Sequence, residues 1–418
     1  QNQERRTKVL KASLTYKALS DHPIITIPGS KSESNRLLIL KACYPNILIA
    51  NLSNSDDTVS LLKGIEQVDG IVDIHHAGTA MRFLTAYFAS KKGTELTLTG
   101  SKRMQERPIK VLVEALKNMG AEIYYLKNEG YPPLKIIGAD LNVSLVTLNA
   151  NISSQYISAL MLIASSLKNG LTINLEGKIT SIPYINMTLD LLKKVGVLGT
   201  FSNNKIQIKP TKTINSITVN VESDWSSASY YYSIIALSRN LELTLNNFSK
   251  NSMQGDSKII SIFKKLGVET IFNKNDNSIL LRHIKAEIID CLSLNLNESP
   301  DIAQTLAVTC FGLGIYCKLE GLKTLKIKET DRLLALKTEL EKLGANVTIT
   351  EQSIEVFRSR KIIENITIET YQDHRMAMAF APLVLKVPIN IIEPNVVTKS
   401  YGTFWKDLLK IGVQVQLK

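Results

Sequence analysis

The chain has 418 residues, 44% of them hydrophobic and 21% charged, and 50 Lys and Arg against 38 Asp and Glu give a formal net charge of +12. This length allows two to four domains with cores of their own. Four cysteines without a CxxC pair exclude a disulfide framework and favour a reducing, cytoplasmic setting. The longest apolar stretches run about ten residues, so neither a membrane helix nor a secretory signal is expected.

Apolar residues at helical spacing predict twelve helices. In chain order they span residues 32–43, 57–64, 78–88, 108–119, 155–167, 184–195, 226–237, 257–266, 301–311, 329–343, 374–385 and 403–411. Alternating runs between them predict strands, among them 96–99, 206–209, 217–221, 241–245 and 347–350. This alternation indicates an α/β protein.

A short motif recurs at the ends of five of these helices: an apolar residue, a glycine, and then a small or branched residue before a strand. Its glycines are Gly120, Gly196, Gly267, Gly344 and Gly412, at intervals of 76, 71, 77 and 68 residues, with a weaker sixth copy at Gly64. A glycine in the left-handed conformation ends a helix without a Cβ clash. The spacing predicts six α/β units of two helices each, three per domain, with the first unit shortened.

The basic balance is typical of proteins that bind nucleic acid, anionic membranes or small anions. Basic runs never exceed two adjacent residues, and no stripe of basic and aromatic residues appears, so we expect neither a nucleic-acid nor a membrane partner. Instead, the basic residues stand at or near predicted helix starts, where free N–H groups attract phosphates and carboxylates. They are Lys31, Arg36, Arg107, Lys328, Arg332, Arg375 and Lys399.

Two other interpretations of these helix starts are disfavoured. Ser, Thr and Asp at a helix start are ordinary caps, but capping does not account for the neighbouring Arg or Lys. The sequence GSKS at 29–32 lacks the upstream glycine of a phosphate-binding loop, so an NTPase is not expected. His75 and His76 are adjacent in a predicted strand and would face opposite sides, so no metal site is expected.

An ordered set of motifs resembles the 5-enolpyruvylshikimate-3-phosphate (EPSP) synthase family of enolpyruvyl transferases. The matching pieces run in family order from residue 28 to residue 399. They include PGSKSESNR (28–36), AGTAMR (77–82), ERPI (106–109), SSQ (153–155), NSMQGD (251–256), KETDR (328–332) and DHRMAM (373–378). Single pieces are weak signals, whereas the ordered set is specific.

The resemblance implies a two-domain inside-out α/β barrel with six βαβαββ-type repeats, three per domain. One domain would comprise residues 1–29 and 224–418 and the other residues 30–223, with the active site in the cleft between them. The implied reaction is an addition–elimination that moves the enolpyruvyl group of phosphoenolpyruvate to the 5-hydroxyl of shikimate 3-phosphate and releases phosphate. It belongs to the shikimate pathway and is a target of glyphosate. The resemblance further implies a monomer that needs no cofactor and no metal.

The resemblance also implies roles for individual residues. Asp301 would be the general base for the 5-hydroxyl, and Glu329 the acid that protonates the methylene carbon, assisted by Lys31. The implied shikimate 3-phosphate site comprises Lys31, Ser32, Arg36, Ser153, Ser154, Gln155, Ser181, Asp301 and Lys328. The implied phosphoenolpyruvate site comprises Lys31, Gly78, Arg107, Gln155, Arg332, Arg375 and Lys399. His374 and Tyr184 would be supporting residues of the active site.

Four positions depart from the commoner family pattern, namely His76, Phe83, Ile182 and Thr324, and their effect on affinity and inhibitor response stays open. One alternative is the sister enzyme that uses UDP-N-acetylglucosamine as acceptor. It carries a catalytic cysteine in the loop that corresponds to residues 100–107, where this chain has none. Another is a non-catalytic repeat protein that binds anions or nucleic acid. The presence of Lys31, Asp301 and Glu329 disfavours it.

Overall fold

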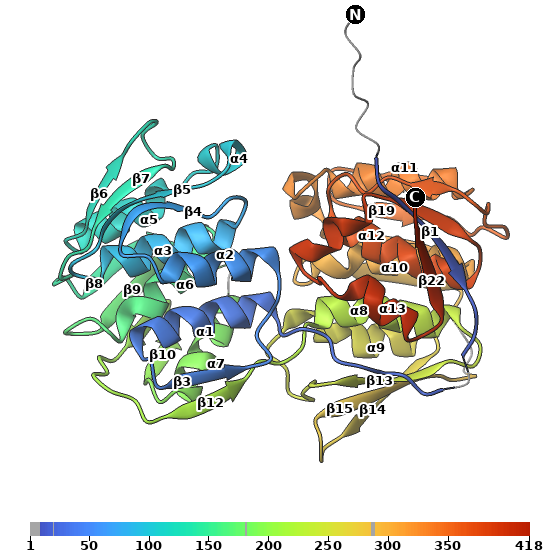
Figure 1. Ribbon diagram of the computed structural model, residues 1–418, viewed down its shortest axis with the longest axis horizontal. Coiled ribbons are helices and arrows are strands. Elements are labelled where there is room, and N and C mark those ends of the chain that lie inside the picture. The colour runs from blue at the N-terminus through green and yellow to red at the C-terminus, as the bar shows by residue number, and fades with distance from the viewer. Residues whose placement is uncertain (1–8, 20, 180–181, 286–288) are drawn as a thin grey trace, which may run out of the picture. The chain divides into compact units, whose positions relative to one another are not determined.

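The computed structural model describes residues 9–19, 21–179, 182–285 and 289–418 (Figure 1). The chain divides into two compact units. One, the inserted unit, spans Pro28–Glu222, and the other, the terminal unit, combines Gln1–Ile27 with Ser223–Lys418. The chain therefore passes between the units twice. Within the described residues, none of the helices is both long and apolar enough to cross a membrane.

The inserted unit alternates helices with short strands. Its helices are α1 (Lys31–Cys43), α2 (Asp56–Ile65), α3 (Gly78–Ala89), α4 (Lys102–Gln105), α5 (Lys110–Asn118), α6 (Ser154–Ala164) and α7 (Ile182–Lys194). Its strands are β3 (Ile47–Ala50), β4 (Asp69–Asp73), β5 (Glu95–Thr99), β6 (Glu122–Tyr125), β7 (Leu134–Ile137), β8 (Leu145–Asn149), β9 (Leu171–Glu176), β10 (Gly199–Ser202), β11 (Lys205–Ile208) and β12 (Ile217–Asn220).

The terminal unit is built in the same way. Its helices are α8 (Trp225–Leu237), α9 (Ile259–Lys264), α10 (Ala303–Leu313), α11 (Arg332–Lys342), α12 (His374–Phe380) and α13 (Phe404–Leu409), with short 3-10 turns between them. Its strands are β1 (Lys11–Tyr16), β2 (Ile24–Ile25), β13 (Glu242–Asn246), β14 (Val268–Asn273), β15 (Ser278–His283), β16 (Cys291–Asn295), β17 (Tyr316–Glu320), β18 (Val347–Ile349), β19 (Ile354–Val356), β20 (Thr367–Ile368), β21 (Ile389–Ile392) and β22 (Val413–Leu417).

Five of the six sheets share one topology, in which a parallel strand pair is followed by an antiparallel pair. In β4-β5-β7-β6, for example, β5 runs parallel to β4 and antiparallel to β7. In one sheet, β1 and β22 form the antiparallel pair, although they lie near opposite ends of the chain. The sixth sheet consists of the parallel pair β12-β3. The prediction of six repeats with a shortened first one is therefore confirmed.

In each unit, the sheets surround a group of helices (Figure 1). All 12 residues of α3 and all 13 residues of α8 are buried, which explains why these helices are apolar on nearly every side. Each unit has its own hydrophobic core. The helix starts consequently project from a rigid, packed interior, a suitable support for site residues.

The repeat glycines were predicted to adopt the left-handed conformation, and this is confirmed: the five have φ between 86° (Gly267) and 108° (Gly120). The prediction that Gly64 is a sixth copy of this motif was wrong. Gly64 lies inside α2, where a Cβ would meet Leu84 Cδ1 at 2.7 Å, so this glycine serves close helix packing instead.

Several predicted helix bounds need correction. The helix expected from residue 329 begins at Arg332, because the carboxylate of Asp331 accepts the N–H of Leu334 as its cap. Lys328 and Glu329 therefore precede the helix. The helix expected from residue 108 begins at Lys110, and the short helix α4 was not predicted.

Candidate active site

The first turn of α3 carries a site shaped by one glycine. Gly78 opens the helix, and no side chain caps its N–H groups. A Cβ on Gly78 would lie 2.5 Å from Nη1 of Arg107, so the guanidinium lies directly against this helix start. A free helix N-terminus next to an arginine is well suited to hold a phosphate or carboxylate.

The first turns of α1 carry Lys31, which is exposed, and Arg36, which is only 3% exposed. Arg36 donates from Nε to Thr188 Oγ1 (2.9 Å), from Nη1 to the carbonyl of Ser32 (2.9 Å) and from Nη2 to Ser158 Oγ (2.8 Å). Its guanidinium also lies 5.6 Å from the ring centroids of both Phe83 and Tyr184.

Arg36 is a buried cation without a salt bridge to any described carboxylate. Burial lowers the pKa of its guanidinium to about 10, although Tyr184 and Glu33 oppose this shift. Two of its five N–H donors are not used by the three hydrogen bonds above. A buried arginine of this kind is costly unless an anion binds to it.

The start of α6 adds hydroxyl and amide groups. Ser153 Oγ caps the helix by accepting the N–H of Gln155 (3.3 Å), and this leaves its own hydroxyl proton free to donate. Gln155 Nε2 donates to Thr79 Oγ1 on α3 (3.1 Å), which links two of the predicted ligand-binding helix starts. Ser154 is the first residue of α6, and Ser181 lies outside the described residues.

In the terminal unit, Arg332 forms ion pairs with three carboxylates. It is 2% exposed and donates from Nε to Asp373 Oδ2 (2.8 Å), from Nη1 to Asp301 Oδ1 (3.0 Å) and from Nη2 to Glu329 Oε2 (2.7 Å). Asp373 is fully buried and also caps α12 through the N–H of Arg375. The predicted base and the predicted acid are thus held by one guanidinium.

Asp301 is surrounded by positive charge. Besides Arg332, its Oδ2 lies 3.6 Å from Nη2 of Arg375. Burial would raise the pKa of the Asp301 carboxyl, but Arg375, Lys328, Arg332 and His374 outweigh it and hold the pKa well below its usual range. In this state Asp301 is ionised and able to accept a proton only weakly.

The remaining predicted residues lie nearby in the terminal unit. His374 Nδ1 is 3.7 Å from Glu329 Oε1 and from Asp373 Oδ1. Lys399 Nζ donates to the carbonyl of Gln372 (2.6 Å), in the turn that leads into α12.

Three residues near the site had received no role from the sequence. They are Asp373, Tyr230, whose hydroxyl accepts from Arg375 Nη1 (3.3 Å), and Asp256, whose carboxylate accepts from Ser226 Oγ. Burial and the nearby Asp301 raise the pKa of Asp256 to about 6, against the opposing effect of the Ser226 hydroxyl. Asp256 and Asp373 stood within motifs that carried the resemblance. Their partners, by contrast, depend on contacts between distant parts of the chain.

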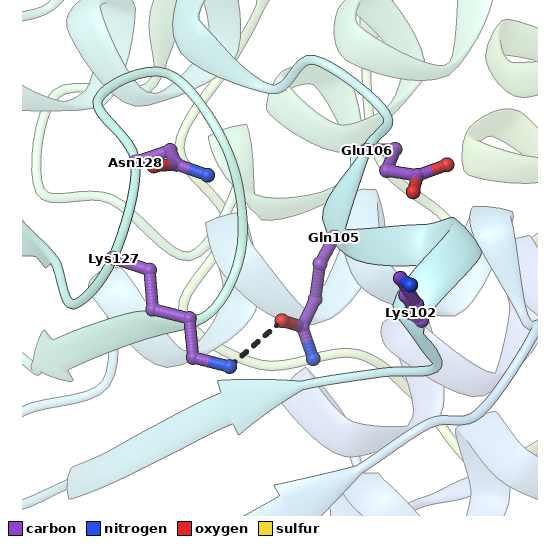
Figure 2. A pocket seen from close by; sticks show the side chains of 5 residues that line it. All are labelled: Lys102, Gln105, Glu106, Lys127 and Asn128. Carbon is purple, nitrogen blue, oxygen red and sulfur yellow. Dashed lines mark hydrogen bonds between the residues drawn. The ribbon is translucent and has the colours of Figure 1, made fainter.

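A separate hollow of about 410 Å³ lies beside α4 and the β6–β7 loop (Figure 2). It is lined by Lys102, Gln105, Glu106, Lys127 and Asn128, with a hydrogen bond of 3.1 Å from Lys127 Nζ to Gln105 Oε1. None of the predicted site residues lines it. Within the described residues, no group of three or more His, Cys, Asp and Glu side chains is arranged to hold a metal ion.

The family model and the curated relatives that match this chain carry the same enzyme name. Residues 63–408 match the family model of EPSP synthase (3-phosphoshikimate 1-carboxyvinyltransferase). A 3-phosphoshikimate 1-carboxyvinyltransferase from Bacteroides fragilis is 44% identical over 397 residues, which cover 94% of this chain and 96% of that protein. The enzyme of the same name from Haemophilus influenzae is 35% identical, with 93% and 96% covered.

Solved structures are similar at the level of the fold. EPSP synthase from Acinetobacter baumannii superposes with a TM-score of 0.81 at 20% identity, over 98% of this chain and all of that one. The enolpyruvyl transferase NikO from Streptomyces tendae has a TM-score of 0.72 at 12% identity, with 98% of each chain covered.

Proposed function

The chain belongs to the EPSP synthase family, and we propose that its two groups of site residues divide the reaction between anion binding and proton transfer. As a 3-phosphoshikimate 1-carboxyvinyltransferase, the protein transfers the enolpyruvyl group of phosphoenolpyruvate to shikimate 3-phosphate in the shikimate pathway. The resemblance drawn from the sequence motifs is confirmed at this level. The roles of single residues are our proposal.

The inserted unit supplies the anion-binding groups. We assign shikimate 3-phosphate to Lys31, Ser32, Arg36, the α6 start at Ser153, Ser154 and Gln155, and Ser181, with Tyr184 in support. The buried guanidinium of Arg36 supports this assignment, because it has no salt bridge to a described carboxylate and keeps two donors for an anionic ligand. Phosphoenolpyruvate is assigned to the α3 start, where Arg107 lies against Gly78.

The terminal unit supplies the acid and the base. The oxygen of the 5-hydroxyl bonds to C2 of phosphoenolpyruvate while Asp301 accepts the hydroxyl proton. Protonated Glu329 gives a proton to C3. The tetrahedral intermediate then loses phosphate, which takes up the proton held by Asp301, and C3 returns a proton to Glu329. The observation that carries this assignment is that Arg332 holds both carboxylates, at 3.0 Å and 2.7 Å.

The low pKa of Asp301 fits this role once substrates are bound. Arg375 and Lys328 are two of the cations that depress it. Anionic substrates bound to these cations partly neutralise them, and this raises the proton affinity of Asp301 towards the value a general base needs. Arg332 and Arg375 thereby bind phosphoenolpyruvate and also adjust the base, while Lys399 contributes to binding alone.

We further propose that the two groups act on the same pair of ligands, and that the protein works as a cytoplasmic monomer with no nucleic-acid or membrane partner. The four free cysteines of the described chain agree with a reducing compartment. Size-exclusion chromatography with light scattering gives the mass in solution, and a dimer would contradict the monomer.

The assignment is tested by phosphate release from phosphoenolpyruvate in the presence of shikimate 3-phosphate. Asp301→Asn should lower kcat by about 100-fold or more, the usual contribution of a general base. Asp331→Asn is the matched control, because it removes a neighbouring carboxylate while asparagine still caps α11. Equal activity of the two variants would remove Asp301 from the mechanism.

A further inference from the structure

A buried hydrogen-bond network supports the loop that carries Arg107. The carbonyl of Pro108, the next residue, accepts from Tyr156 Oη at 2.5 Å and from Arg82 Nη2 at 3.4 Å. Tyr156 is 7% exposed and Arg82 is 5% exposed, so both donors are shielded from water. A carbonyl oxygen has two lone pairs and therefore accommodates both.

Arg82 joins this loop to the anion-binding helix start. Its Nη1 donates to the carbonyl of Gly78 (3.1 Å) and contacts Sδ of Met104 in α4 (3.6 Å). No described carboxylate forms a salt bridge with it. Burial, followed by repulsion from Arg107, lowers the pKa of the Arg82 guanidinium. A buried cation without a carboxylate partner lowers the stability of the fold, so Arg82 is expected to have a function of its own.

The backbone on both sides of Pro108 is fixed as well. The N–H of Arg107 donates to the carbonyl of Met104 (3.1 Å), and the N–H of Ile109 donates to the carbonyl of Gly130 (2.9 Å). Proline has a fixed φ and no N–H of its own, so its carbonyl is the one polar backbone group left to orient this residue. Tyr156 and Arg82 provide that orientation.

We propose that Tyr156 is a positioning residue: through the carbonyl of Pro108 it holds Arg107 against the first turn of α3 for phosphoenolpyruvate. Tyr156 directly follows Gln155, which bonds Thr79 in that same turn. One helix start therefore aligns both sides of the anion site. The inference rests on the proposed role of Arg107.

Tyr156→Phe is the sharpest test, because it removes one hydroxyl and keeps the ring, whose centroid lies 5.9 Å from the guanidinium of Arg82. We expect KM for phosphoenolpyruvate to rise about threefold to tenfold, the equivalent of one hydrogen bond. Both kcat and KM for shikimate 3-phosphate should stay within about twofold, because the loss concerns binding that is uniform along the reaction.

Tyr44→Phe is the matched control. Tyr44 is 6% exposed in the same unit, and its hydroxyl likewise donates to a backbone carbonyl, that of Thr211 (2.8 Å). Both variants should lower the melting temperature, but only Tyr156→Phe should change KM for phosphoenolpyruvate. The inference is overturned if the two variants have the same KM.

A double-mutant cycle with Arg107→Lys separates this inference from the proposed function. If Tyr156 acts through Arg107, Tyr156→Phe should add little to the KM of the Arg107→Lys variant. Full additivity would contradict positioning. An Arg107→Lys variant with unchanged KM would instead refute the assignment of Arg107 itself.

Discussion

In the inserted unit, the buried arginines Arg36 and Arg82 donate to neutral oxygens, mainly hydroxyls and carbonyls, whereas in the terminal unit Arg332 and Arg375 face carboxylates. Burial lowers the pKa of Arg36 to about 10, while Asp373, Asp301 and Glu329 outweigh the same effect at Arg332 and raise its pKa. The first arrangement leaves positive charge available to ligands. The second uses part of the positive charge to hold an acid and a base in place.

The largest effect that would test this division is on turnover. Glu329→Gln should lower kcat by about 100- to 10,000-fold, the range of general acid catalysis, with a much smaller change in substrate affinity. Steady-state phosphate release measures the first, and calorimetric titration of shikimate 3-phosphate measures the second. Glu341→Gln, on the exposed face of α11 with Lys337 as its partner, is the control. Unchanged turnover in Glu329→Gln would show that Glu329 is not the general acid.

The next effect is on stability. Asp373→Asn leaves the cap of α12 possible but takes one of three carboxylates from the buried Arg332. Removal of one partner from a buried ion pair costs about 3 kcal/mol or more in the free energy of unfolding. Urea unfolding followed by circular dichroism measures it. A loss below about 1 kcal/mol would show that Asp301 and Glu329 alone balance the guanidinium.

A third test uses pH, because Asp256 and Asp301 shift in opposite directions. The folded-state pKa of Asp256 is raised to about 6, so its contribution to stability is complete below its usual pKa and is lost as pH rises through 6. Asp301 is lowered, so its contribution is present above its usual pKa and is lost only in acid.

Asp256→Asn should therefore gain stability relative to the parent between pH 4 and pH 7, by about 2 kcal/mol. Urea unfolding at several pH values measures this gain. Asp276→Asn is the control, because Asp276 also accepts a serine hydroxyl, from Ser278, but in an exposed turn. Parallel pH profiles of parent and Asp256→Asn would contradict the raised pKa.

The smallest expected effect on stability is at Arg36. Arg36→Met removes a buried cation that has no described salt bridge, and methionine fills similar space, so the free energy of unfolding should change by less than about 1 kcal/mol. KM for shikimate 3-phosphate should nevertheless rise strongly. A loss as large as that of Asp373→Asn would mean that Arg36 is structural, and the contrast between the units would fail.

Local sequence rules predicted much of the fold. Gly120, Gly196, Gly267, Gly344 and Gly412 end their helices with positive φ, as the recurring motif indicated. The rule failed at Gly64, which lies inside α2: there a glycine is needed because Leu84 of α3 leaves no room for a Cβ. The start of α11 was predicted three residues too early, because the side chain that caps this helix is that of Asp331.

The site was predicted only in part, for the same reason. Motif order identified Arg332, Asp301 and Glu329 as site residues, but nothing in the sequence indicated that one guanidinium bonds both carboxylates together with Asp373. Tyr156 received no role at all, because its partner, the carbonyl of Pro108, is a backbone atom 48 positions away. Backbone acceptors carry no side-chain signal in a sequence.

The sequence by itself determined the chemistry available to this protein: the repeat count, the basic residues at helix starts, the acid and base candidates, and the enolpyruvyl transferase family. These are properties of residue identity and spacing, which local backbone preferences and motif order express directly. Only the tertiary structure decided which arginines are paired with carboxylates and which remain available to bind anionic ligands. Ion pairing and burial depend on contacts between residues that are distant along the chain.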